Sequence, residues 1–531
     1  MKTINRRKFI KRSTMAAAAV ALLPGNLPVQ AAKAAAPASS GAIGTGASKT
    51  SGKVPAWVKS MRESDMDGLG PDGKHVPGYR ATGTGSSVGT KDPQKPHKMK
   101  LTKEEQGILD GKEGETKAKV MKTVVAFGNA FGATKLVKLG GAPHTSLYNA
   151  PQFMEPMIKV FEKCADEGLK SYAPFTVNPR PYDLYNVQNS PHDMAMVFEG
   201  YPLQPRLEYV LMRLGARDFN SRSCMCFLPE IGNKPEPGTM VAWAESSATN
   251  FGNSGLGIRT NRLACGMELM CALVGKAPYF GLMTDEGRMA TWVIDVKTTK
   301  EPDWGVLGAA IGIKVTEDVP FIVGIDKYFG GEITGENMHK LKAMGASTAA
   351  NGAVGLYHVE NVTPDAKEKG RKLLAKGYKT YVVDDKEIKR IYDEFPNLWG
   401  KKDAKPTRLF LGCPHNTYHE VVTWGRMITE ELKKRGQDKV ALPIHMFVSI
   451  PVRNHVLDDH PVLVRDMKRA GMNFTNMCTL MFTGLKGFGE REFPVTNSNK
   501  TRKYSSTRYF PDDVLLEIAM TGEIPKGAEV A

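Results

Sequence analysis

Hydrophobic and polar positions in the second half of the chain alternate between two periods. Short apolar runs at 379–383, 408–411 and 440–448 have the length and composition of buried strands. Between them, 386–395 and 420–434 carry apolar residues at helical spacing. Strands that alternate with helices in this way predict an α/β domain with parallel strands.

The first half of the ordered sequence predicts helices. Thr102–Glu105 has the pattern of a capping box, and a longer helix is predicted over 115–131. Residues 153–165 place Phe153 and Cys164 on one apolar helical face, so Cys164 is expected in the core.

The first 31 residues have the pattern of a twin-arginine export signal. Arg6 and Arg7 precede a large apolar residue and a lysine, and an apolar run follows at Met15–Leu23. This run is too short to span a bilayer and ends near small residues suited to cleavage. An ordinary secretory signal with a chance arginine pair is the alternative. We expect export of the folded chain by the twin-arginine translocation machinery, to the periplasm or otherwise outside the inner membrane.

Residues 32–100 differ in composition from the rest. Positions 32–53 are rich in Ala, Gly, Ser, Thr and Lys, which is typical of a flexible linker, and 54–99 read as an irregular arm. The ordered catalytic region is expected over 101–525. No other segment is apolar enough for a membrane helix.

The net charge and the cysteine content limit the classes of function that the chain can have. The chain of 531 residues has a formal charge of +16, and removal of six basic residues with the signal leaves 16 − 6 = +10. This excess suits an anionic substrate, and no nucleic-acid motif accompanies it. The seven cysteines are odd in number and scattered, which does not favour a disulfide framework.

The densest polar stretch is 245–262, beside the apolar Trp243 and Leu256. It contains a carboxylate, several hydroxyls, three amides and two guanidiniums. A polar loop with helix caps is the plain interpretation. Two arginines in a polar cluster also suit a carboxylate or phosphate ligand, and we favour a substrate site.

Three cysteines lie in separate loops: Cys224, Cys413 and Cys478. Cys413 follows a predicted strand and precedes a helix, a position where α/β folds bind ligands. The spacing is neither that of a zinc ribbon nor that of a ferredoxin. It suits a cluster held by three thiolates that leaves one iron open, while a zinc site completed by His415 stays possible.

With these residues in view, the chain from Leu101 to about Gly522 resembles the large subunit of aconitase X. The matching stretches are Leu101–Glu105, Phe175–Asn178, Ala242–Arg262, Gly275–Gly281, Gly412–His415 and Thr496–Ser498 with Lys500. The resemblance implies an aconitase-like α/β multi-domain architecture with parallel or mixed sheets. It also implies a hydro-lyase that acts on a small anionic hydroxy acid.

The resemblance also implies a cofactor and site residues. An iron–sulfur cluster, 4Fe–4S or 2Fe–2S, would be held by Cys224, Cys413 and Cys478, with Cys226 as a rival ligand to Cys224. Catalytic roles fall to Glu245, Ser246 and Ser247. Substrate-binding roles fall to Asn178, Asn253, Ser254, Arg259, Thr260, Asn261, Arg262, Ser498 and Lys500, and a weaker one to His415.

Family members also need a small swivelling domain that supplies a catalytic serine. Residues 32–100 are too short and irregular to form it, so we expect a separate small subunit. The alternative is a non-catalytic iron–sulfur subunit, or one that keeps only the pocket, within an exported complex.

Overall fold

The computed structural model describes residues 98–184, 186–187, 191–263, 266–401, 403–485 and 488–528, which belong to one compact unit. The predicted export signal at 1–31, and the arm at 32–100 up to position 97, lie outside the described residues. No helix within the described ranges is long and apolar enough to cross a bilayer.

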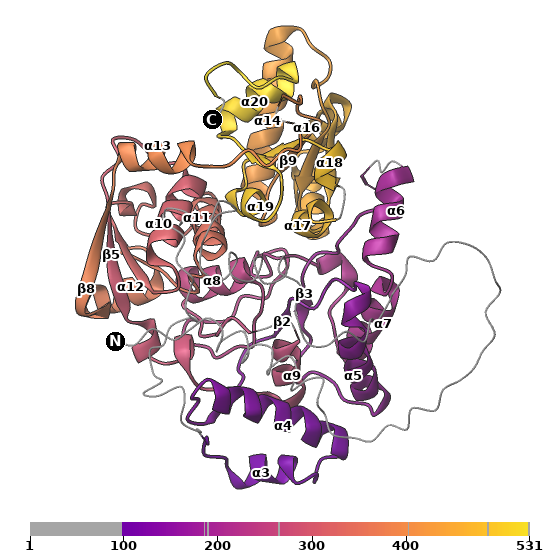
Figure 1. The fold of residues 1–531 in the computed structure, drawn as a ribbon, viewed down its shortest axis with the longest axis vertical. Coiled ribbons are helices and arrows are strands. Elements are labelled where there is room, and N and C mark those ends of the chain that lie inside the picture. Colours follow the sequence, from indigo (N-terminus) through magenta and orange to yellow (C-terminus); the bar gives the residue numbers. More distant parts are fainter. Residues whose placement is uncertain are drawn as a thin grey trace, which may run out of the picture. The chain divides into compact units, whose positions relative to one another are not determined.

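The amino-terminal region of the described chain is mainly helical (Figure 1). Its strands form two small sheets, β1 antiparallel to β4 and β2 parallel to β3. Its helices are α3 (Lys103–Leu109), α4 (Glu115–Ala130), α5 (Glu155–Asp166), α6 (Pro191–Gly200), α7 (Gln204–Leu214), α8 (Ser246–Gly255) and α9 (Met267–Val274). Its strands are β1 (Leu136–Lys138), β2 (His144–Thr145), β3 (Thr176–Val177) and β4 (Lys276–Pro278).

A four-stranded parallel sheet follows, in the order β7-β6-β5-β8. Its strands are β5 (Ala290–Val296), β6 (Pro320–Val323), β7 (His358–Val359) and β8 (Leu374–Val383). The helices of this region are α10 (Trp304–Val315), α11 (Met338–Asn351), α12 (Pro364–Lys369) and α13 (Asp385–Asp393).

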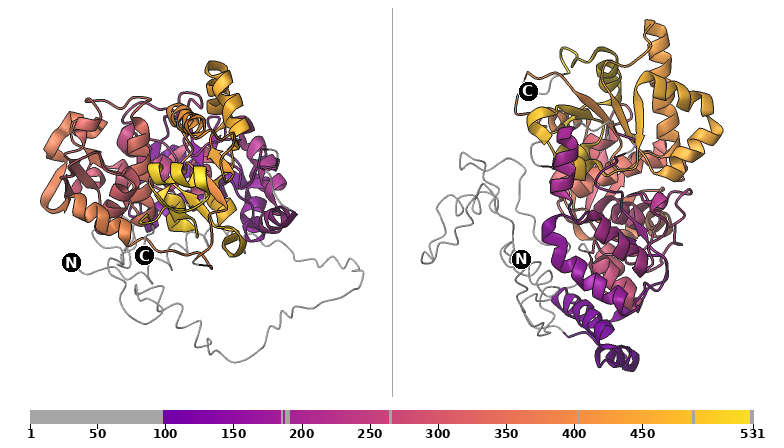
Figure 2. Two further views of the ribbon diagram at one scale, coloured as in Figure 1. Left: turned by 90° about the horizontal axis from the view of Figure 1, so that it is seen from above. Right: turned by 90° about the vertical axis from the view of Figure 1, so that its right-hand side faces the viewer.

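The carboxyl-terminal region is built on a five-stranded parallel sheet in the order β11-β10-β9-β12-β13. Its strands are β9 (Arg408–Leu411), β10 (Ile444–Phe447), β11 (Met472–Thr475), β12 (Pro494–Thr496) and β13 (Arg508–Tyr509). Its helices are α14 (Tyr418–Arg435), α15 (Ile450–Asp459), α16 (Pro461–Ala470), α17 (Thr479–Thr483), α18 (Phe488–Arg491), α19 (Asn499–Tyr504) and α20 (Asp512–Thr521). The two larger sheets are separate, and each is covered by its own helices (Figure 2).

The hydrophobic pattern predicted this α/β arrangement correctly. The parallel strands β8, β9 and β10 alternate with helices α13 and α14, and the capping box at Thr102 is present. Cys164 is fully buried, as expected. Phe153 is 78% exposed, so its predicted inward position is wrong. A 3-10 turn at Gln152–Met154 precedes α5, and the α-helical face begins only at Glu155.

Helices α10 and α11 pack at very close range because α10 has glycine where they meet. A Cβ built at Gly308 would overlap the carbonyl oxygen of Met344 and lie 2.6 Å from Cβ of Ser347. Backbone cannot move aside as a side chain can, so this contact requires glycine.

We predict that Gly308→Ala lowers the free energy of unfolding by at least about 2 kcal/mol, because the added methyl group forces the two helices apart. Denaturant unfolding would measure the change. Gly107→Ala in α3 is the matched control, since its Cβ would meet only the flexible side chain of Lys112. Equal stability of the two variants would contradict the prediction.

Candidate active site

The carboxyl ends of three parallel strands of one sheet bring the predicted chemistry together. Cys413 follows β9, Cys478 follows β11, and Ser498 and Lys500 follow β12. These strands are parallel within one sheet, so the segments that follow them emerge at the same edge. The Oγ of Ser498 donates to the carbonyl of Cys413 at 2.5 Å, which ties two of these segments together.

Cys224 reaches the same edge from the amino-terminal region. Its Sγ accepts a hydrogen bond of 3.3 Å from the backbone N–H of His415. Electrostatic interactions link the thiol of Cys413 to those of Cys224 and Cys478. All three thiols are free and partly exposed. The structure therefore brings the three cysteines together, although they are far apart in sequence.

The thiols are protonated as the structure stands. Burial raises the pKa of Cys413 to about 11, although the ammonium of Lys500 acts in the opposite direction. Burial also raises the pKa of Cys224 and that of Cys478. A thiol with a raised pKa is a poor nucleophile, but it loses its proton when a metal binds it.

Cys226 lies elsewhere. It is fully buried in the main core, beside Phe227, and its thiol is hydrogen-bonded to Thr176. The placement favours Cys224 as the residue of this loop that faces Cys413.

The ring of His415 is not free to complete a zinc site. Its Nε2 lies 3.1 Å from the carbonyl oxygen of Met477, and its Nδ1 lies 3.4 Å from Oγ of Ser223. Burial lowers the pKa of His415 to about 4, so the ring stays neutral. Among the described residues, no three His, Cys, Asp or Glu side chains are placed to hold a single metal ion. The zinc alternative stays a prediction that these contacts do not favour.

A buried ion pair stands beside the thiols. Glu245 caps the N-terminus of α8, where its carboxylate accepts from the backbone N–H of Ala248 at 2.7 Å and from Oγ of Ser247 at 2.6 Å. Lys500 forms an ion pair with Glu245. Its ammonium also donates to Oγ of Ser246 at 3.0 Å and of Ser247 at 3.2 Å. The three predicted catalytic residues and Lys500 thus form one network.

The ion pair stays charged over the whole physiological range. Burial alone would raise the pKa of Glu245, but Lys500 and the hydrogen bonds outweigh it and lower the pKa to about 2. Burial alone would lower the pKa of Lys500, and the carboxylate of Glu245 outweighs that effect and raises it. Glu245 is therefore a weak proton acceptor, and Lys500 is a permanent cation.

Asn178 lies under this network rather than in an open pocket. Its Oδ1 is 2.9 Å from Nε2 of His144, and Nδ1 of His144 is 3.0 Å from Oγ1 of Thr176. Burial lowers the pKa of His144 to about 4, which keeps the imidazole neutral. His144 could not be found from the sequence pattern, because β2 and β3 have only two residues each.

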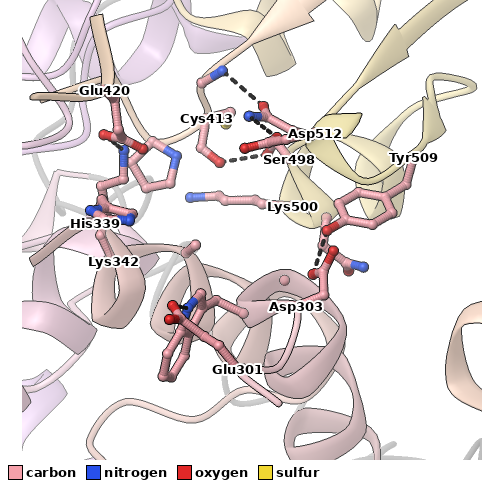
Figure 3. Close-up of a pocket in the computed structure, with 17 residues that line it drawn as sticks. Glu301, Asp303, His339, Lys342, Cys413, Glu420, Ser498, Lys500, Tyr509 and Asp512 are labelled. Atoms are coloured by element: carbon pink, nitrogen blue, oxygen red, sulfur yellow. Dashed lines mark hydrogen bonds and ion pairs between the residues drawn. The ribbon is translucent and has the colours of Figure 1, made fainter. Parts of the chain in front are cut away.

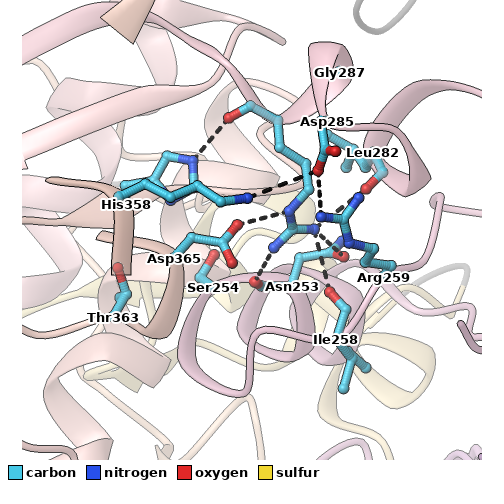
Figure 4. Close-up of polar contacts among 12 residues, drawn as sticks. Asn253, Ser254, Ile258, Arg259, Leu282, Asp285, Gly287, His358, Thr363 and Asp365 are labelled. Carbon is cyan, nitrogen blue, oxygen red and sulfur yellow. Dashed lines mark hydrogen bonds and ion pairs between the residues drawn. The ribbon is translucent and has the colours of Figure 1, made fainter. Parts of the chain in front are cut away.

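Asn253 and Thr260 belong to the scaffold. The amide of Asn253 donates to the carbonyl of Thr260 at 2.9 Å and accepts from its N–H at 3.0 Å. Arg288, which the sequence analysis missed, lies at the centre of this group. Its guanidinium donates to Asp365 at 2.8 Å and to backbone carbonyls that include that of Ile258 (Figure 4).

Three further predicted pocket residues are also engaged in scaffold contacts. Arg259 forms an ion pair with Asp285, and Asn261 joins two neighbouring backbone groups through its side-chain amide. Ser254 accepts from the N–H of Tyr357 at 2.9 Å. Arg262 lies apart from them, within electrostatic range of Glu317. The binding roles expected of Asn253, Ser254, Arg259, Thr260, Asn261 and Arg262 stay predictions that these contacts do not favour.

A cavity of about 320 Å³ opens beside Cys413 and Lys500 (Figure 3). Side chains from the four-stranded-sheet region and from the carboxyl-terminal region line it together. Its polar lining consists of Glu301, Asp303, His339, Lys342, Cys413, Glu420, Asn497, Ser498, Asn499, Lys500, Tyr509 and Asp512. Cys413, Ser498 and Lys500 belong both to this cavity and to the thiol cluster.

Fold and site together define an α/β enzyme whose reactive groups meet at the carboxyl edge of a parallel sheet. Comparison with known proteins gives the family. The model of the aconitase X first domain matches residues 98–286, and that of the second domain matches 290–393. The chain belongs to the aconitase X family.

Relatives of known activity support the same assignment. The phosphomevalonate dehydratase large subunit of Thermococcus kodakarensis is 30% identical over 354 residues, which cover 66% of this chain and 81% of that protein. The cis-3-hydroxy-L-proline dehydratase of Hypocrea jecorina is 25% identical over 426 residues, which cover 77% and 64%. The crystal structure of Thermococcus kodakaraensis aconitase X in its holo-form aligns with a TM-score of 0.65 at 28% identity, covering 79% of this chain and all of that one. Dehydratases are hydro-lyases, and this chain is an enzyme of that class.

One buried carboxylate near the site predicts a pH-dependent stability. Glu268, in the first turn of α9, accepts from Oγ1 of Thr145 at 2.7 Å and from the N–H of Ser146 at 3.0 Å. Burial raises its pKa from 4.5 to about 7. The folded state therefore holds this proton more tightly than the unfolded state, and stability is lost as the pH rises through 7.

We predict that Glu268→Gln matches the parent chain in stability near pH 4.5 and exceeds it by up to about 3 kcal/mol above pH 8. Glutamine resembles the protonated acid and pays no ionisation cost. Denaturant unfolding from pH 4.5 to 9 would measure the difference, with the exposed Glu199→Gln as control. A difference that does not change with pH would contradict the prediction.

Proposed function

We propose that this chain is the large subunit of an exported iron–sulfur dehydratase that acts on a small hydroxy acid. The observation that best supports this proposal is that the free thiols of Cys224, Cys413 and Cys478 lie close together although they come from separate segments. They lie beside the buried ammonium of Lys500. A small swivelling subunit would complete the site, and the curated relatives named as large subunits support this division.

The donor set fits an iron–sulfur cluster better than a single ion. In a 4Fe–4S cluster each thiolate binds a different iron atom, so the sulfurs can stand farther apart than the ligands of one ion. Cys224, Cys413 and Cys478 would hold the cluster. When bound, a cluster with one iron free of protein ligands supplies a Lewis acid for a departing hydroxyl group.

The residues of this chain would bind and orient the substrate. Lys500 is a permanent cation beside Cys413, so it suits the carboxylate of a hydroxy acid. It would also stabilise the negative charge that develops when a proton leaves the neighbouring carbon. Glu245 and its two serine neighbours fix the ammonium in place rather than accept that proton, since the pKa of Glu245 is about 2. The base would come from the serine of the small subunit.

Export follows from the sequence at Arg6 and Arg7. The twin-arginine route carries folded proteins, so the thiols would already be bound to iron when they meet an oxidising compartment. A chain that kept free thiols there would be exposed to oxidation.

The cofactor is tested by removing one thiol. In the complex purified without oxygen, we expect iron, sulfide and visible absorbance in the parent chain and their loss in Cys413→Ala. Cys226→Ala is the matched control, and it should keep all three signals because Cys226 lies in the core. A metal-free parent complex with full dehydratase activity would contradict the proposal.

The role of the ammonium is tested with a second pair of variants. We predict that Lys500→Gln lowers kcat/KM for the hydroxy acid by about 100-fold or more, since a charged hydrogen bond in a dry site contributes about 3 kcal/mol. Lys503→Gln alters an exposed lysine on the same helix and should leave kcat/KM unchanged. Equal activities, at equal iron content, would remove Lys500 from the site.

A further inference from the structure

Four helices that surround the ion pair and the adjoining cavity begin with a carboxylate. Glu245 caps α8 and Asp303 caps α10, while Glu420 lies in the first turn of α14 and Asp512 in that of α20. The N-terminus of a helix can bind phosphate, because its free N–H groups and the helix dipole favour an anion. In α8, α10 and α14 a carboxylate already accepts from a backbone N–H at this end of the helix.

Hydrogen bonds hold each of the three carboxylates at the cavity, and those of Asp303 and Glu420 come in part from backbone N–H groups at the start of their helices. Asp303 accepts from the N–H of Val306 at 2.9 Å and from the hydroxyl of Tyr509 at 2.5 Å. Glu420 accepts from the N–H of Thr417 at 2.8 Å and pairs with Lys342. Asp512 accepts from the amide of Asn497 at 3.1 Å.

The charges that line the cavity leave a surplus of carboxylates. Four line it (Glu301, Asp303, Glu420 and Asp512), against the two ammonium groups of Lys342 and Lys500. Both ammonium groups are already paired, one with Glu420 and the other with Glu245. Lys340 pairs with Glu301, so Asp303 and Asp512 are the lining carboxylates that make up the surplus. Burial raises the pKa of Asp512 to about 6, and the carboxylates of Asp303 and Glu420 add to that effect. The lining carboxylates would therefore repel a dianionic group such as a phosphate monoester.

An unpaired buried hydrogen-bond donor indicates which kind of ligand group the cavity binds instead of phosphate. Asn499 is only 2% exposed, lines the cavity, and has no hydrogen-bond partner for its Nδ2 among the described residues. Its Oδ1 is already taken, by Asn351 at 2.9 Å and Arg502 at 2.9 Å. A hydroxyl group can accept from Nδ2 and donate to a carboxylate such as Asp512, so it satisfies both kinds of lining group.

We propose that this cavity receives the uncharged, hydroxyl-bearing end of the substrate and rejects a phosphate ester. This inference rests on the proposed function, in which Lys500 holds the carboxylate at the other end. The substrate would then be an unphosphorylated polyhydroxy acid, in contrast to the compound in the names of the phosphomevalonate dehydratases. The selectivity comes from the carboxylates that line the cavity.

Binding to the purified complex tests the proposal, with calorimetry on three pairs of probes. Mevalonate, gluconate and glycerate would each be compared with its terminal phosphate monoester. We expect at least one free acid to bind, and its phosphate ester to bind at least ten times more weakly. Asp512→Asn should reduce that ratio about five-fold by removing one negative charge while keeping an oxygen that can accept from Asn497. Asp458→Asn, an exposed change on α15, should leave the ratio unaltered.

Three outcomes would overturn the inference: a phosphate ester that binds as tightly as its free acid, no binding by any free acid, or an Asp512→Asn ratio equal to that of the parent. Iron and sulfide content, measured on the same samples, distinguishes this failure from that of the proposed function. A complex that discriminates against phosphate but lacks a cluster would refute the dehydratase proposal alone.

Discussion

The buried ion pair between Glu245 and Lys500 is the interaction on which the site depends. It joins the start of α8, in the amino-terminal region, to the segment that follows β12 in the carboxyl-terminal sheet. Neither charge could be buried there alone, because an unpaired buried charge costs several kcal/mol. Glu245 also has φ of 85°, a conformation that strains any residue other than glycine. Its contacts with Lys500, Ala248 and Ser247 offset that strain.

The pair also explains why the thiols meet where they do. Cys413 and Lys500 leave adjacent strands of one sheet, so fixing Lys500 against α8 brings Cys413 towards the amino-terminal region. Cys224 comes from that region and binds the backbone of His415. The same contact between regions therefore positions the cation and two of the three thiols. A site assembled in this way is complete only when the amino-terminal and carboxyl-terminal regions have packed together.

The sequence predicted the sheet and the thiols better than it predicted the pocket. Strands such as β9 are short, buried and mostly apolar, so their position could be found from the pattern alone. The order of the strands was not predicted, and it is the structure that places Cys413 and Lys500 at one edge. The stretch 245–262 was harder, because a polar residue that binds substrate and one that binds buried backbone look the same in sequence. Asn253 satisfies backbone groups of Thr260, and only the coordinates show this. His144 and Arg288 were missed because their partners are far away in the chain.

The net charge of the chain likewise does not predict the charge inside the cavity. A formal charge of +16 suggests a site that attracts anions, yet the cavity beside Lys500 has more carboxylates than ammonium groups. The two observations agree once the pairing is known. Surface lysines set the net charge, and salt screens them beyond about 10 Å. The potential inside the cavity depends instead on the few groups that line it and on which of them are already neutralised. Lys342 and Lys500 are each paired with a carboxylate, whereas Asp303 and Asp512 accept hydrogen bonds from uncharged groups. These lining groups, together with the unpaired amide of Asn499, determine which end of a hydroxy acid can enter, and the total charge does not.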